Sequence, residues 1–299
     1  MKFQNQIFVF LLCVLTVACT KESNPPVDEP TIEEEEQYII DGALPGLFSV
    51  SSKKKVRFSM GNLQHNVKTD EWQFAPSQYC ILGTQNENIK SSDFEWTDMF
   101  LWGSSGYNYT DYLHGYTESR DIDNTPWDWG VYNKISNGGN QKNIWRTLTA
   151  YEWDYIINQR PNSYELFTQA IVGGQYGWVI LPDNWETPEG IKFVQFVEFK
   201  QNRLQQIQED PTIYKDSDWI IMEKNGAVFL PSTGYMYNQQ IYHKLYDGAI
   251  YWTSTYVSDY TRAYAFNLNS KVVLGQKIMD CISNESRQIY LPVRLVKNF

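Results

Sequence analysis

The chain has 299 residues, of which 42% are hydrophobic and 16% aromatic; this composition supplies a packed core and excludes global disorder. Its formal net charge is -10, but residues 46–299 hold 27 acids and 23 bases, so the body of the chain is nearly balanced. Because no basic stripe is available to displace counterions from phosphates, we expect no nucleic-acid partner.

Residues 1–18 predict a lipoprotein signal peptide. An apolar run at residues 7–15, too short to span a bilayer, follows Lys2. The sequence T-V-A-C that ends at Cys19 resembles a bacterial lipobox, with Thr where Leu is usual. Lipidation of Cys19 would hold the protein on a membrane, so we expect an outer-membrane lipoprotein at the cell surface of a Gram-negative bacterium. The alternative is an ordinary secreted protein whose signal peptide is cleaved near this position.

Residues 19–45 predict a flexible acidic tether. They hold eight acids against one base, Lys21, together with several prolines. Their apolar content is too low to offset the entropy lost by ordering the chain, and like charges repel one another. A solvated spacer explains this segment without a partner.

The first part of the body predicts strands. Residues 46–50 and 56–60 alternate apolar and polar side chains, with three lysines at the turn between them, and residues 72–75 resemble a third strand. We expect the C-terminal strand, residues 292–296, to lie beside residues 56–60, since a terminal strand often ties the chain end into a sheet. Residues 83–143 show no period but are rich in Trp and Tyr, which predicts a long ordered loop region pinned by aromatic side chains.

A helix followed by a buried strand is predicted next. Residues 149–160 form the clearest helical pattern, because Thr149 can cap the helix and Glu152 stands three residues later, as a capping box requires. Residues 177–182 then read as a buried strand that ends at proline.

The same order returns later in the chain. Asp216 or Ser217 would cap a second helix, Gly226 would end it, and residues 227–231 would form the strand. A hairpin turn at Asn225-Gly226 is the alternative.

Three strands are expected in the last third of the chain, at residues 250–254, 263–268 and 292–296. Their spacing suits one antiparallel sheet.

Several segments together resemble bacterial members of the C-type lectin-like superfamily. They are L-T-A-Y-E-W-D-Y-I-I-N-Q-R, G-W-V-I-L-P-D-N-W, G-A-V-F-L-P-S-T-G-Y, Y-W-T-S-T-Y and P-V-R-L-V. The pattern is similar to the major paralogous domains of fibrobacters, which share an architecture with formylglycine-generating enzymes. The resemblance implies an α+β fold in which two helices lie on a small antiparallel sheet with long ordered loops, as a single domain over residues 46–299.

The catalytic residues of the related enzymes are not matched. Formylglycine-generating enzymes use a close pair of cysteines, whereas Cys80 and Cys281 stand far apart in the sequence, as a disulfide or as two thiols. The related iron enzymes need clustered histidines, and His65, His114 and His243 lack metal-ligand spacing. We therefore expect no enzymatic activity, no cofactor and no metal.

Calcium-dependent sugar binding is also disfavoured by the sequence. True C-type lectins bind calcium through clustered carboxylate and amide oxygens, and the segment P-D-N-W-E around Asp183 echoes their motif only in part. We interpret Asp183 as part of a turn that follows a strand.

The loops of the last third carry the candidate ligand-binding residues, because rigid aromatics provide contact area at a low entropy cost. The expected ligand is a glycan or a surface protein. The candidates are Tyr235, Tyr237, Asn238, Tyr242, Tyr256, Asp259, Tyr260 and Arg262.

Three alternatives stay open. About half of these tyrosines would pack against the sheet if they followed the usual fate of aromatics. The composition of residues 235–288 also resembles the variable proteins of diversity-generating retroelements. Finally, the protein would be a structural subunit of a surface or fimbrial complex if the aromatic region at residues 94–132 formed an interface.

Overall fold

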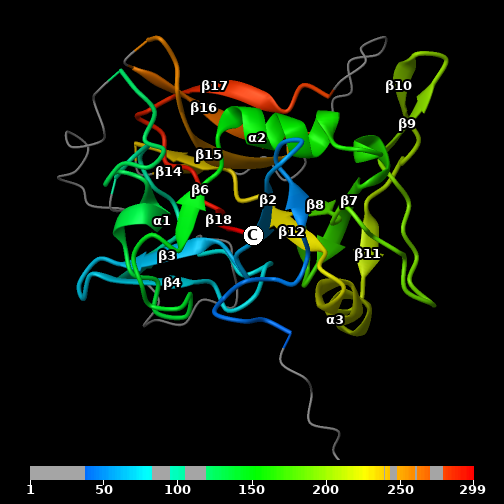
Figure 1. Ribbon diagram of the computed structural model, residues 1–299, viewed down its shortest axis with the longest axis horizontal. Coiled ribbons are helices and arrows are strands. Elements are labelled where there is room, and N and C mark those ends of the chain that lie inside the picture. The colour runs from blue at the N-terminus through cyan, green and yellow to red at the C-terminus, as the bar shows by residue number, and fades with distance from the viewer. Residues whose placement is uncertain are drawn as a thin grey trace, which may run out of the picture. The chain divides into compact units, whose positions relative to one another are not determined.

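The computed structural model describes residues 38–82, 95–104, 119–238, 240–242, 248–259, 261–269 and 279–299. The protein is mostly β, with a few short helices and several small antiparallel sheets where one small sheet was expected (Figure 1). One compact unit spans Gln37–Phe299. Residues 38–45, assigned above to the tether, therefore belong to this unit, in which Leu44 is fully buried. Across the described ranges, no helix has the length and apolar character needed to cross a membrane.

The first sheet joins the early and late parts of this unit. Its four antiparallel strands, in the order β1, β2, β18 and β6, span Phe48–Ser49, Lys55–Phe58, Leu295–Asn298 and Trp145–Thr147. Val296 lies opposite Phe58, which confirms the predicted neighbour of the C-terminal strand. The alternation predicted for β2 is also present, since Val56 and Phe58 are fully buried whereas Lys55 is exposed.

The second sheet contains the strands of both predicted helix-strand units. Its strands, in the order β11, β7, β8 and β12, span Thr212–Tyr214, Phe167–Val172, Gln175–Ile180 and Val228–Pro231. β11 runs parallel to β7, and the two predicted buried strands, β8 and β12, pair antiparallel. Gly173 and Gly174 join β7 to β8 with φ of +56° and +76°, a left-handed conformation that glycine adopts at little cost.

The third sheet corrects one prediction. β15 (Ala249–Tyr256) and β16 (Arg262–Leu268) pair as expected, but the C-terminal strand lies in the first sheet. β17 (Ile282–Ser286) pairs with β16 in its place, at the top of Figure 1. The sequence of β17 is I-S-N-E-S, which lacks the apolar alternation that would have predicted a strand.

Three smaller groups of strands complete the β-structure. β3, β4 and β5 span Leu63–Asn66, Glu71–Phe74 and Trp96–Thr97. β9 and β10 span Val197–Lys200 and Arg203–Gln206, and β13 and β14 span Tyr235–Tyr237 and Gln240–Tyr242. The strand predicted at residues 72–75 is therefore present as β4.

The first predicted helix is confirmed with its capping box. α2 (Ala150–Asp154) continues as a π-helical turn, η3 (Tyr155–Gln159). The backbone N–H of Glu152 donates to Thr149 Oγ1 at 3.1 Å, and the N–H of Thr149 donates to Glu152 Oε2 at 3.0 Å. These reciprocal bonds satisfy two amides that the first turn leaves without helical partners.

The second predicted helix, α3 (Asp216–Lys224), is present with a different cap. Lys215 occupies the cap position and makes no side-chain capping bond, so the prediction that Asp216 or Ser217 caps the helix was wrong. Asp216 instead lies in the first turn, where its negative charge interacts favourably with the positive end of the helix dipole. Gly226 ends the helix with φ of +93°, and its N–H donates to Glu223 O, so the alternative hairpin turn is excluded. Two shorter elements are α1 (Trp129–Tyr132) and the 3-10 turn η4 (Ser163–Glu165).

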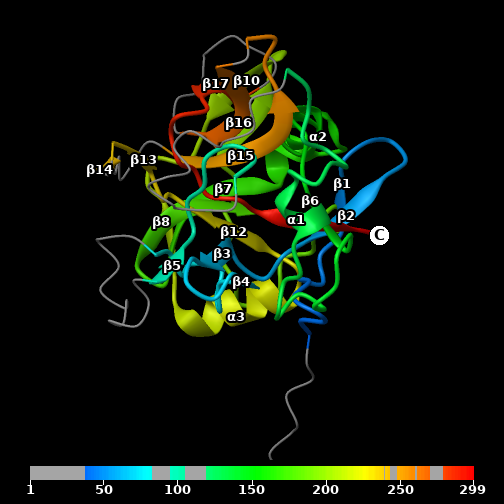
Figure 2. The ribbon, with the colours of Figure 1, turned by 90° about the vertical axis from the view of Figure 1, so that its left-hand side faces the viewer.

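Tryptophan packing joins these elements. Trp153 of α2 stacks on Phe266 of β16 with ring centroids 4.1 Å apart, and it also packs against Phe58 of β2. α2 therefore connects the first and third sheets (Figure 2). Each of these large rings removes extensive apolar surface from water, which is the main source of stability in such a core.

Buried indoles also hold the loop region in place. Trp102 Nε1 donates to Thr253 O at 2.7 Å, and Trp252 Nε1 donates to Phe100 O at 2.7 Å. Trp129 is likewise buried, so buried tryptophans hold the described loops in place. Trp127 and Tyr132, also expected to pin this region, are 44% and 53% exposed, so the prediction is confirmed only in part. The tyrosines at 107, 109, 112 and 116 lie outside the described residues.

Candidate functional site

The β13–β14 hairpin carries four of the eight predicted ligand-binding residues. Its register places Tyr235 opposite Tyr242 and Tyr237 opposite Gln240. The three tyrosines and Gln240 therefore share one face, here called the tyrosine face. The rings of Tyr235 and Tyr242 stack with centroids 5.1 Å apart and planes 13° apart. Tyr242 is 39% exposed, so the face presents a preformed aromatic surface to solvent.

The opposite face of the hairpin is anchored in the protein. Met236 and Ile241 pack against Met99 and Leu101. The backbone of Met236 exchanges hydrogen bonds with Tyr290, at 3.1 and 2.8 Å. The Met236 face is therefore fixed. On the tyrosine face, Tyr235 is half-buried and packs against the core, whereas Tyr242 is exposed. A ligand would not have to order the strands on binding.

Asn238 lies beside the tyrosine face at the hairpin turn. It is exposed, and its φ of +48° is in the left-handed region, which asparagine tolerates better than most residues. An exposed asparagine amide offers both a hydrogen-bond donor and an acceptor.

Of the other predicted ligand-binding residues, Tyr256 ends β15, Asp259 lies in the turn that follows and Arg262 begins β16. Asp259 accepts hydrogen bonds from the N–H and Oγ1 of Thr261, at 2.9 and 2.8 Å, and these bonds hold the pKa of Asp259 below its usual value. Arg262 donates to Asn284 O at 3.3 Å. The Asp259 side chain therefore stabilises the turn, whereas the Arg262 side chain contacts β17. Tyr260 lies outside the described residues.

The structure does not bring the two groups of candidates together. In Figure 2 the β13–β14 hairpin lies at the left edge, whereas the turn between β15 and β16 lies at the top. Tyr256 stands between them in sequence and is half-buried, with its N–H donating to Asp121 Oδ1 at 2.9 Å. The hairpin therefore forms a candidate surface of its own.

The cysteines and histidines take structural positions where they are described. No disulfide joins Cys80 and Cys281, and burial raises the pKa of the Cys281 thiol, which disfavours a reactive thiolate. His65 stacks on Trp72 and lies 2.9 Å from Asp70. Within the described part of the chain, no cluster of three or more His, Cys, Asp or Glu could hold a metal ion. The histidines at 114 and 243 lie outside that part.

Asp183 follows β8 in a turn, as predicted, and anchors β1. Its carboxylate accepts hydrogen bonds from Ser49 N at 3.0 Å and from Ser49 Oγ at 2.7 Å. Lys55 Nζ lies 2.9 Å away, and the buried guanidinium of Arg160 lies 3.3 Å away. Burial alone would raise the pKa of Asp183, but the Ser49 hydrogen bonds and the two cations together lower it. Both carboxylate oxygens are therefore used within the protein.

Replacement of Asp183 by alanine is expected to lower the free energy of unfolding near pH 7 by about 2–4 kcal/mol, because it leaves the Arg160 guanidinium buried without its carboxylate. The Asp183 side chain is 17% exposed, so the loss stays below that of a fully buried pair. Denaturant titration measures it, with the exposed Asp210 changed to alanine as the matched control. A lowered pKa stabilises the fold above the unfolded-state pKa and loses this effect as the pH falls, so the difference from wild type should shrink near pH 3. A constant difference across that range would contradict this assignment.

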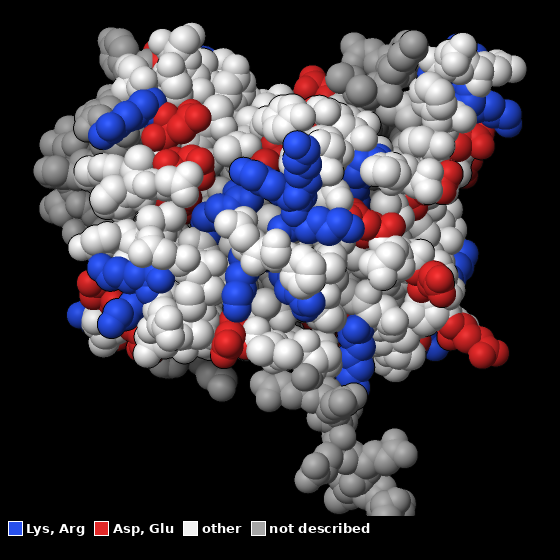
Figure 3. Space-filling view, viewed as in Figure 1, with Lys and Arg blue, Asp and Glu red and all other residues white. Residues whose placement is uncertain are grey.

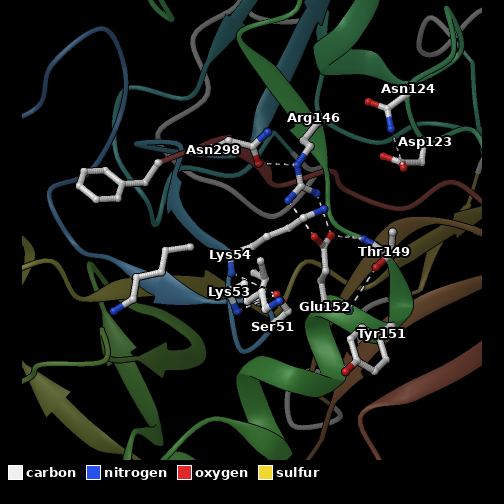
Figure 4. A pocket seen from close by; sticks show the side chains of 13 residues that line it. Ser51, Lys53, Lys54, Asp123, Asn124, Arg146, Thr149, Tyr151, Glu152 and Asn298 are labelled. Atoms are coloured by element: carbon white, nitrogen blue, oxygen red, sulfur yellow. Dashed lines mark hydrogen bonds and ion pairs between the residues drawn. The ribbon is translucent and has the colours of Figure 1, made fainter.

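A second candidate surface surrounds a pocket of about 580 Å³, here called the lysine pocket. Basic side chains gather near the centre of the face in Figure 3, over β2 and the C-terminal strand. The pocket lies between the β1–β2 turn, β6 and the start of α2 (Figure 4). Its charged and amide side chains are Lys53, Lys54, Lys55, Asp123, Asn124, Arg146, Glu152 and Asn298.

Charges within the lysine pocket are only partly compensated. Arg146 donates to both carboxylate oxygens of Glu152, at 2.7 and 2.8 Å, in a two-pronged pair. Asp123 lies nearby and accepts a hydrogen bond from Asn124 at 2.8 Å. Burial raises the pKa of Asp123, as does Glu152, while Arg146 and Lys54 oppose the shift. The pocket therefore combines cations with hydrogen-bonding oxygens.

The lysine pocket was missed at the level of sequence. Lys53 to Lys55 were assigned only to a turn; Lys53 and Lys54 lie there, but Lys55 is the first residue of β2. The three consecutive lysines were a signal, but the pocket also needs side chains from residues 123–152 and 298–299, which no local pattern connects.

Comparisons with protein-family models, with curated proteins and with solved structures found no match.

Proposed function

We propose that this chain is a non-catalytic surface lipoprotein that binds a glycan through the tyrosine face. This proposal rests on the β13–β14 hairpin. Tyr237 and Tyr242 share one face with the half-buried Tyr235, while the Met236 face is fixed in the protein. Rigid tyrosines offer large apolar faces with few side-chain torsions to restrict, which suits stacking against sugar rings.

Hydrogen-bonding groups accompany these rings. Gln240 shares the tyrosine face, and Asn238 is exposed at the turn. Amides both donate and accept, so they match sugar hydroxyl groups, which do the same. A few polar groups beside an apolar surface are typical of a specific small-ligand site.

The sequence supports the same proposal. The segments quoted above resemble the C-type lectin-like superfamily, and a C-type lectin-like fold would provide a rigid scaffold for variable binding loops. A lipid on Cys19 and an acidic tether would hold the binding domain away from an outer membrane.

Glycan-array screening of the purified protein tests this function. Replacement of Tyr237 and Tyr242 by alanine is expected to weaken the affinity for a bound neutral glycan about tenfold or more, since loss of about 1.4 kcal/mol of contact energy corresponds to a factor of ten. Tyr132→Ala is the matched control, because Tyr132 is 53% exposed and belongs to α1.

The outcomes separate the candidate partners. Unchanged glycan affinity in a correctly folded Tyr237→Ala/Tyr242→Ala variant would remove the tyrosine face from the site. If no glycan binds but a surface protein is captured in a tyrosine-dependent way, the ligand is a protein and the glycan proposal fails.

A further inference from the structure

The lysine pocket contains two cations that the protein does not neutralise. Arg146 is paired with Glu152, and Lys55 is paired with Asp183. Lys53 and Lys54 are exposed and form no ion pair with any other described residue. Their backbone N–H groups both donate to Ser51 Oγ, which fixes the turn that carries them. The two free ammonium groups therefore lie on an ordered turn at the pocket mouth.

Lys54 is directed across the pocket. Figure 4 shows its side chain extending from the turn toward the Arg146–Glu152 pair. Its charge also acts on the carboxyl of Asp123 on the far wall. An anionic group in the pocket would meet Lys54 and the edge of Arg146, whose Nε donates to Asn298 Oδ1 at 2.8 Å.

The rest of the pocket suits a neutral polar ligand with a ring. Tyr151 is 59% exposed and Phe299 is 75% exposed, so both present aromatic surface at the rim. Asp123, Asn124 and Asn298 provide hydrogen-bonding oxygens and amides. Two carboxylates within the pocket disfavour a polyanion, because each would repel a second or third negative charge.

We propose that the lysine pocket binds an acidic sugar residue, with its carboxylate or sulfate group on Lys53 and Lys54 and its hydroxyl groups on Asp123, Asn124 and Asn298. One anionic group matches two free cations beside a paired arginine, and a saccharide ring matches the exposed aromatic rim. A cavity of about 580 Å³ accommodates one or two sugar units. The site is separate from the tyrosine face and does not depend on it.

Titration calorimetry with the full chain tests this site. The ligands are a glucuronate-containing oligosaccharide, a sulfated oligosaccharide and a neutral oligosaccharide of the same length. Lys53→Ala/Lys54→Ala is expected to weaken binding of the acidic ligand about tenfold or more, and added salt should weaken wild-type binding because exposed charges are screened. The carboxylate and sulfate ligands distinguish which anion the pocket prefers.

Matched controls identify a specific site. Lys134→Ala/Lys192→Ala removes the same charge from two exposed lysines outside the pocket and should leave the affinity unchanged. Tyr151→Ala should weaken the acidic ligand without changing the salt dependence, since it removes ring contact and no charge.

Three results would overturn the proposal. The first is no measurable binding of either acidic ligand by the wild-type protein. The second is an equal loss of affinity in Lys53→Ala/Lys54→Ala and in Lys134→Ala/Lys192→Ala. The third is full retention of binding in Lys53→Ala/Lys54→Ala. The Tyr237→Ala/Tyr242→Ala variant should still bind the acidic ligand, so failure of the neutral-glycan function and failure of this site are distinguishable.

Discussion

Replacement of Arg294 by alanine is expected to lower the free energy of unfolding by about 3–5 kcal/mol, through a large cavity and lost buried hydrogen bonds. Arg294 is 1% exposed. Its NH2 donates to Gln78 Oε1 at 2.6 Å and its NH1 to Asn62 Oδ1 at 3.3 Å. Burial lowers the pKa of Arg294 to about 10, while Tyr251 and Glu223 oppose the shift, so the guanidinium remains charged at neutral pH.

Arg294 acts through a buried polar network. Gln78 Oε1 also accepts from Phe229 N, and Gln78 Nε2 donates to Glu223 Oε1 at 2.9 Å and to Ala227 O at 3.1 Å. Glu223 in turn accepts a hydrogen bond from Tyr38. The network therefore ties the segment before β18 to α3, to β12 and to the first described residue. Removal of Arg294 leaves polar acceptors buried with fewer donors, which costs more than the loss of an exposed bond.

Denaturant titration of three variants separates charge from volume. Arg294→Met keeps most of the side-chain volume and is expected to lose less stability than Arg294→Ala, because the cavity contribution is removed. Arg203→Ala, at an exposed position on β10, should change stability by no more than about 0.5 kcal/mol. If the free energy of unfolding of Arg294→Ala stayed within about 1 kcal/mol of wild type, the buried network around Arg294 would not be a main source of stability.

Local patterns predicted those parts of the fold where a few neighbouring residues decide the structure. Thr149 and Glu152 predicted the start of α2 because a capping box requires only residues three apart. The alternation around Val56 and Phe58 predicted β2, since one face of that strand is buried. Gly226 predicted the end of α3 because its backbone adopts positive φ.

Tertiary contacts decided what the sequence did not predict. β17 has no apolar alternation and is a strand because β16 provides a partner edge. Arg294 stands within an apolar run, and nothing near it in sequence shows that Gln78 and Asn62 will meet it. The lysine pocket likewise combines a turn, a strand and a helix start.

The candidate site was predictable in composition and only partly in position. Tyr235, Tyr237 and Tyr242 were chosen as exposed loop aromatics, and the structure places them on one face of a hairpin. Asp259 and Arg262 were chosen as polar contacts from the same loops, but their described hydrogen bonds are with the turn and with β17. Residue type indicates what a side chain can bind, whereas its neighbours decide whether it is available.

Stability is expected to fall as the pH rises from about 4 to about 7, because two carboxyls are buried at Asp98 and Asp128. Burial raises the pKa of each from 3.8 to about 7. Hydrogen bonds to the carboxylates oppose this rise in pKa without abolishing it. Asp98 accepts a hydrogen bond from Leu82 N at 2.8 Å. Asp128 accepts from Thr147 N at 3.0 Å and from Thr147 Oγ1 at 2.8 Å. A raised pKa means that the folded state holds a proton that the unfolded state has released, so each further rise in pH within this window favours unfolding.

Asparagine at either position removes this titration while keeping the shape and one acceptor oxygen. Relative to wild type, Asp98→Asn and Asp128→Asn should each gain up to about 4 kcal/mol of stability between pH 4 and pH 7, the free energy equivalent to the difference between the two pKa values. Unfolding free energies measured by denaturant titration at several pH values provide the test, and Asp210→Asn, at an exposed position, is the matched control. The pKa of Asp183 is lowered, so its contribution to stability increases with pH and changes at lower pH. It therefore cannot cause a loss of stability between pH 4 and pH 7. Parallel stability curves for wild type and both variants would show that neither buried carboxyl takes up a proton in this range.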